Sequence, residues 1–192
     1  MVRFVLLAAF GLVAGPAFAH PEAGVVGGLA SGFLHPLSGL DHLVAMVAVG
    51  LWAAQLGRPG VWLLPLSFMG VMALGGVAGA LGLALPMAEV AIAGSAVVLG
   101  VCVALAVRVP AAAAAAVVAG FALFHGFAHG SEMPGASDAV AYGLGFVAAT
   151  GLLHSAGVGA GVLARGPVGA RAVRAVGAGI AGLGAVFLLS LA

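Results

Sequence analysis

The sequence contains no lysine and very little charge of either sign. Of its 192 residues, 6% are charged and 64% are hydrophobic, and the mean hydropathy is +1.31. A soluble domain carries about 25% charged residues, so this inventory cannot cover a water-exposed surface. The absence of lysine also excludes a retinal Schiff base, and therefore a rhodopsin.

Further absences exclude other functions. The net charge of +1 is too small to indicate nucleic acid as a partner. No phosphate-binding loop of the G-x-x-x-x-G-K-[ST] type occurs, so we do not expect ATP hydrolysis by that route. The single cysteine, Cys102, cannot form an internal disulfide and is interpreted as a small buried thiol.

The first nineteen residues have the pattern of a secretory signal peptide. Arg3 provides a positive charge, an apolar run follows, and Ala17-Phe18-Ala19 matches a small-x-small cleavage site. We therefore expect a signal peptide at 1–19 and a single transmembrane domain at 20–192. The alternative, an uncleaved first helix, is disfavoured because the apolar run is short for a span.

Six apolar segments follow, each near the roughly 20 residues that cross a bilayer. We expect spans at 37–57, 61–85, 88–107, 110–130, 138–164 and 171–191. A shorter apolar stretch at 24–34 is interpreted as a half-helix that re-enters the membrane or lies at its outer surface. The fold class is therefore all-α, a polytopic membrane helix bundle.

Small residues at four-residue spacing predict how this bundle packs. They occur in Gly75-x-x-x-Gly79 and Gly157-x-x-x-Gly161, among others. Such residues let membrane helices approach closely, which predicts a compact bundle and not a wide pore.

The arginines predict the orientation. With the mature N-terminus outside, the loops that hold the arginines after residue 20 all lie on the cytoplasmic side, as the positive-inside rule requires. These arginines are Arg58, Arg108, Arg165, Arg171 and Arg174. The acids then lie at or near the outer face: Glu22, Asp41, Glu89, Glu132 and Asp138. We expect a bacterial inner-membrane protein with a periplasmic N-terminus.

Five of the six histidines lie in three polar clusters inside this apolar chain. In the first, Pro36 is expected in the first turn of a helix, with His35 near its cap. His42 would follow two turns later on the same face, with Asp41 as a ligand or as an acceptor that orients an imidazole. A polar helix start at the membrane surface is the alternative. Met46, one turn further, is either a soft ligand or core packing.

The second cluster is the most specific. His125 and His129 have the i, i+4 spacing that places two imidazoles on one helix face, and Glu132 continues that face. Two histidines at this spacing are the usual way in which one helix offers two metal ligands. The zinc-protease version needs a glutamate directly after the first histidine, where this chain has Gly126.

His154 stands alone, deep in the fifth predicted span. A polar group inside a bilayer is costly and usually functional, so His154 is predicted to be a deeper relay site, with a hydrogen-bonded core histidine as the alternative.

Imidazoles and carboxylates together suit divalent nickel, copper, zinc or cobalt. After cleavage, the α-amine of His20 would lie beside its imidazole, which makes it a further candidate ligand.

The three clusters together resemble the HupE/UreJ family, small bacterial membrane proteins regarded as nickel, and in some cases cobalt, permeases. The likeness rests on His35-Pro-x-x-Gly-x-Asp41-His42, Phe124-His125-Gly-x-Ala-His129-Gly-x-Glu132-x-Pro134 and Thr150-Gly-Leu-Leu-His154. It covers essentially the whole mature chain. The resemblance implies uptake of Ni²⁺ from the periplasm along these histidines and acids, and an indirect link to hydrogenase or urease maturation.

The leading hypothesis is therefore a secondary permease and not an enzyme, with a divalent metal as substrate and no prosthetic group. Nickel is the first choice, with cobalt, copper or zinc as alternatives. Two other hypotheses stay open: an intramembrane metal-dependent hydrolase, and a metal sensor or assembly subunit that moves no ion. The sequence leaves open the coupling ion, the direction of flux and whether the chain forms a homo-oligomer.

Overall fold

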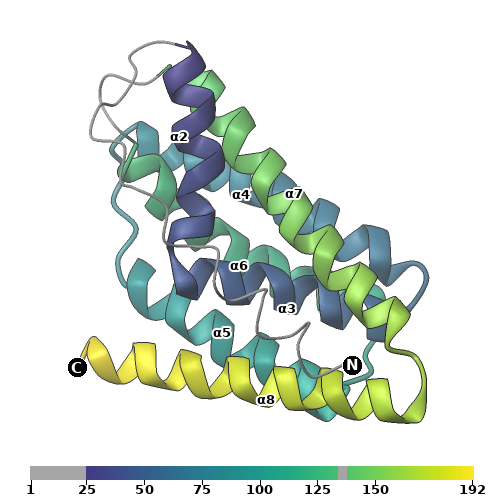
Figure 1. Cartoon of the computed structure of the whole chain (residues 1–192). Helices are drawn as coiled ribbons and strands as arrows, with labels where there is room; N and C mark the ends of the chain where they lie inside the picture. Colours follow the sequence, from purple (N-terminus) through teal and green to yellow (C-terminus); the bar gives the residue numbers. More distant parts are fainter. Residues whose placement is uncertain (1–24, 134–137) are drawn as a thin grey trace, which may run out of the picture.

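The computed structural model describes residues 25–133 and 138–192, and within these it is built from helices alone. They are α2 (Val25–Ser38), α3 (Leu40–Leu56), α4 (Gly60–Ala80), α5 (Ala88–Leu105), α6 (Ala111–Ser131), α7 (Ala139–Leu163) and α8 (Pro167–Ser190) (Figure 1). The predicted signal peptide, His20 and Glu22 lie outside the described residues. The all-α prediction is confirmed.

Five of these helices, α4 to α8, are long and apolar enough to cross a membrane. The pair α2 and α3 makes a sixth candidate span, although it is bent by 82°. Large apolar side chains on the outside of the bundle, such as Leu74, Leu144 and Leu189, are more than 60% exposed. Such a surface suits lipid and not water, so the chain is a multi-pass membrane protein.

Helices α4 and α8 each differ from the predicted span at one end. Helix α4 ends at Ala80 and not near 85, because Gly82 adopts a left-handed conformation (φ 71°) that ends the helix. Helix α8 begins at Pro167 and not at 171, because proline suits the first helical position. Arg171 and Arg174 therefore lie in the first two turns of α8 and not in a loop.

The prediction that Pro36 begins the first span was wrong. Pro36 lies near the end of α2, which starts at Val25 and contains His35 in its last turn. Proline cannot donate the backbone hydrogen bond that would hold this turn, and the helix ends two residues later. Gly39 then has an extended backbone (φ −90°, ψ 112°), and α3 departs at 82°. His35 and His42 therefore lie on two helices and do not share a helix face.

Helices α4 and α6 pack with their backbones in direct contact. A Cβ atom at Gly126 would overlap the carbonyl oxygen of Met72, and one at Gly130 would overlap that of Gly76. In return, Gly75 and Gly79 of α4 face carbonyl oxygens of α6. The predicted close packing at these glycines is confirmed.

Helix α7 makes the same kind of contact with two other helices. Gly157 lies against the Val47 carbonyl of α3, and Gly50 of α3 lies against the His154 carbonyl. Near the other end of α7, Gly145 faces the Leu29 carbonyl of α2. Helix α8 lies along α5 through glycines of both helices (Figure 1). These contacts fix the backbone that carries every histidine described below.

Gly126→Ala is expected to destabilise the protein by about 1–3 kcal/mol, because the added methyl group forces α4 and α6 apart. Unfolding of the purified protein in mixed micelles measures the change. Gly120→Ala on the same helix is the matched control, because a Cβ there meets no atom within 4 Å. Equal stability of the Gly126→Ala and Gly120→Ala variants would contradict this account of the packing.

Candidate functional site

Three side chains from two helices meet at one end of the bundle. His35 of α2, His129 of α6 and Glu132, which caps α6, each offer one ligand atom, and these atoms lie within 4.8 Å of one another. His35 Nε2 and Glu132 Oε2 are 3.2 Å apart. His129 is 3% exposed, whereas the Glu132 side chain is 52% exposed. The trio therefore joins the surface to the interior.

The histidines continue inward from this trio as a row of rings. The His35 and His129 ring centroids are 4.8 Å apart, and His129 and His42 are 4.1 Å apart. His42 is then 4.8 Å from His125, which is fully buried. The i, i+4 pair on α6 and the histidines of the first cluster thus form one site, reached from three helices.

Asp41 orients His42. Asp41 Oδ1 accepts hydrogen bonds from the His42 backbone N–H (2.8 Å) and from its ring Nδ1 (2.9 Å). An ionised carboxylate only accepts, so Nδ1 carries the proton and Nε2 keeps a free lone pair. Of the two roles predicted for Asp41, this geometry favours the orienting one.

Ser95 does the same for His125, a role that was not predicted from the sequence. The Ser95 hydroxyl donates to the Ile92 carbonyl (2.6 Å), so it accepts from His125 Nε2, 2.9 Å away. The other ring nitrogen, Nδ1, is then the one with a free lone pair. A polar serine in the apolar sequence of α5 is the only sequence signal that indicated a functional role for Ser95. Its position in the sequence does not show that it contacts α6.

Buried imidazole nitrogens lack hydrogen-bond partners both in this row and at His154. Among the described residues, six such atoms are buried without a hydrogen bond: His42 Nε2, His125 Nδ1, and both ring nitrogens of His129 and His154. Buried polar atoms almost always have a partner in a native protein. The two nitrogens freed by Asp41 and Ser95 are both among the six. The free lone pairs of these nitrogens therefore suit a bound metal cation, which the chain itself does not supply.

His154 is separated from the row by an aromatic ring. Phe68 of α4, fully buried, lies with its centroid 5.5 Å from that of His125 and 5.1 Å from that of His154. His154 is 1% exposed and has no hydrogen bond with a described residue. It is therefore a second, isolated imidazole beyond an apolar barrier.

The remaining predicted residues lie elsewhere. Met46 is 1% exposed and belongs to the apolar core of the bundle. The hydroxyl of Thr150, one turn before His154, donates to the Met72 sulfur (3.7 Å). Cys102 is free and only half-buried, contrary to the expectation of a buried thiol.

Comparison with known proteins identifies a family and a close relative in sequence. Residues 7–187 match the family model described as HupE / UreJ protein. The chain is 47% identical over 175 residues to Protein HupE of Rhizobium leguminosarum bv. viciae, which covers 91% of this chain and 92% of that protein. No solved structure matches the chain.

Proposed function

Because the chain belongs to the HupE/UreJ family, we propose that it is a secondary permease that imports a divalent transition metal, nickel first among the candidates. The observation that carries this proposal is the row of His35, His129, His42 and His125, which leads from the surface into the bundle. An ion conductor needs successive sites that attract the ion and also release it. Neutral imidazoles supply such moderate binding.

In this proposal the ion enters at Glu132 and His35. Glu132 is exposed and carries the negative charge that attracts a cation. The ion then passes from His129 to His42 and His125, whose free nitrogens are set by Asp41 and Ser95. At each step the ion would exchange one imidazole ligand for the next. The membrane potential would drive this movement with about 2.3 kcal/mol per charge per 100 mV.

Phe68 divides this route into two parts. It would have to turn aside before an ion could move from His125 to His154. A buried apolar constriction of this kind is one way in which channels and transporters gate. In this proposal His154 receives the ion on the cytoplasmic side of the barrier and serves as the relay towards the cell interior, where metalloenzyme maturation consumes the metal.

A hydrolase is the second candidate function. Two histidines and one glutamate with an open position are the ligand set of several catalytic zinc sites, and His35, His129 and Glu132 have that composition. A site used only for catalysis has no need of the further histidines behind it. A sensor that binds metal without moving it is the third possibility, and only a measurement of flux separates it from a permease.

The test is uptake of radioactive nickel by cells that express the wild type or the double variant His125→Ala/His129→Ala. Cobalt, copper and zinc serve as competitors, and the amount of inserted protein is measured in both cases. Accumulation that disappears in the double variant supports the permease. No accumulation of any metal by correctly inserted wild type would refute it and favour the hydrolase or the sensor.

Glu132→Gln is expected to raise the nickel concentration needed for half-maximal uptake by roughly tenfold, because it removes charge at the entrance and weakens the contact with His35. Concentration-dependent uptake measures this. Glu89→Gln is the matched control, since Glu89 is also exposed but lies in the first turn of α5, outside the trio. The same shift in both variants would show that Glu132 acts only through its general charge.

A further inference from the structure

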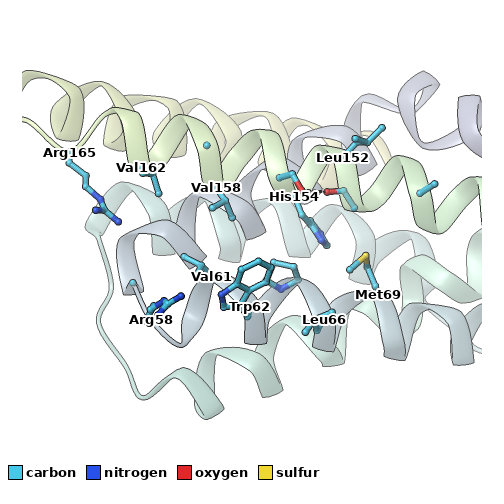
Figure 2. A pocket seen from close by; sticks show the side chains of 16 residues that line it. Arg58, Val61, Trp62, Leu66, Met69, Leu152, His154, Val158, Val162 and Arg165 are labelled. Carbon is cyan, nitrogen blue, oxygen red and sulfur yellow. Dashed lines mark hydrogen bonds between the residues drawn. The ribbon is translucent and has the colours of Figure 1, made fainter.

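We propose that an anionic phospholipid binds in the groove between α4 and α7, with its phosphate between Arg58 and Arg165 and one acyl chain along the groove. This groove is a cavity of about 870 Å³. Figure 2 shows the two arginines together at one end of it and His154 and Met69 towards the other.

The shape and lining of the groove suit an acyl chain. Along α7 its wall extends from Arg165 to Ala148, a length of about 25 Å at 1.5 Å per residue. Half of a hydrocarbon core measures about 15 Å, so a chain from one leaflet fits along the wall. Leu66 and Leu152, which line it, are 61% and 60% exposed. An exposed apolar wall of this kind suits contact with a hydrocarbon chain.

The charge at the groove mouth selects an anion. Among the described residues, Arg58 and Arg165 have neither a hydrogen bond nor an ion pair, whereas Arg174 donates to the Ala104 carbonyl (2.7 Å). None of the four described acids, which are Asp41, Glu89, Glu132 and Asp138, lines this groove. Two guanidinium groups that line the same end of one groove provide several donors for a phosphate. The mouth therefore fits an anionic lipid head group.

Trp62 places the mouth at the level of lipid head groups. It lies one turn after Arg58, lines the same groove and is 64% exposed. Tryptophan gathers at the boundary between head groups and acyl chains. Basic pockets between membrane helices on the cytoplasmic side are known sites for anionic lipids. By the positive-inside rule, this end of α4 and α7 is the cytoplasmic one.

The test is native mass spectrometry of the purified full-length protein with added phosphatidylglycerol or phosphatidylcholine. We expect one phosphatidylglycerol to be retained in preference to phosphatidylcholine. Arg58→Gln/Arg165→Gln should lower this retention by roughly fivefold per arginine removed. Arg171→Gln is the matched control, because Arg171 lies near the same end but outside the groove and donates to its own helix at Pro167. Equal retention of both lipids, or equal loss in the control, would overturn the proposal.

A second variant tests the acyl chain without changing any charge. Gly159 lines the groove, and a Cβ there meets no atom within 4 Å, so the Gly159→Leu side chain is expected to occupy part of the groove without pushing the helices apart. It should reduce lipid retention several-fold, whereas Gly179→Leu, at an equally open position of α8, should not. Inorganic phosphate should not displace the lipid. Displacement by phosphate, together with full retention by Gly159→Leu, would reduce the site to a simple anion site and refute lipid binding.

Discussion

His129→Ala is expected to lower nickel uptake at least tenfold, an estimate of about the size seen when groups around a metal site are removed. His129 contacts both His35 and His42, so it joins the entrance to the interior. Its loss leaves Glu132 and His35 without their third partner and opens a gap in the row. Nickel binding by the purified protein should fall as well, because the trio is the most exposed part of the site.

The measurement is uptake of radioactive nickel, normalised to the amount of inserted protein, with equilibrium dialysis for binding. Ser131→Ala is the matched control on the same helix, because its hydroxyl bonds only to the Ala128 carbonyl of its own turn (2.7 Å). It should leave both quantities unchanged. Normal uptake by well-inserted His129→Ala would remove this histidine from the route.

His154→Ala is expected to separate binding from transport. Uptake should again fall about tenfold, because a relay ligand is lost. Nickel binding to the purified protein should stay close to the wild-type value, since Phe68 lies between His154 and the other histidines. If the protein were a sensor or a hydrolase that acts at the trio of His35, His129 and Glu132, the loss of the distant His154 would not be expected to change its function.

Parallel uptake and dialysis on the same preparation test this second prediction. Ser155→Ala is its control: the serine follows His154 directly, is exposed, and donates only to the Gly151 carbonyl one turn back (2.7 Å). If His154→Ala transports nickel normally, His154 is a packing residue. If it loses binding and uptake together, the separation at Phe68 is wrong.

The spans and the histidine pair on α6 were predictable because their information is local. Hydropathy over about 20 residues identifies a membrane helix, and i, i+4 spacing on a helix brings His125 and His129 to one face. The glycine spacing likewise indicated close packing, which Gly75 and Gly157 confirm. These features can be predicted without knowing which helices are neighbours in the bundle.

The bend at Gly39 and the role of Ser95 were not predictable for the opposite reason. The seven-residue spacing from His35 to His42 suits one continuous helix, and only the packing of α2 on α7, seen at Gly32 and Tyr142, shows that the chain turns there. Ser95 gains its role from a contact 30 residues along the chain. Pairings between helices are set by the whole bundle, which a single sequence does not display.

The glycine contacts have a mechanical consequence. They join α4 to α6 in one rigid body and α2 and α3 to α7 in another, because backbones in direct contact cannot slide without collision. Phe68, His125 and His129 belong to the first body, and His35, His42 and His154 to the second. A small rotation between them would keep the distance from His125 to His129 constant while changing those from His129 to His42 and from Phe68 to His154. Such a rotation would therefore change the distances between successive imidazole ligands and the position of the Phe68 barrier together.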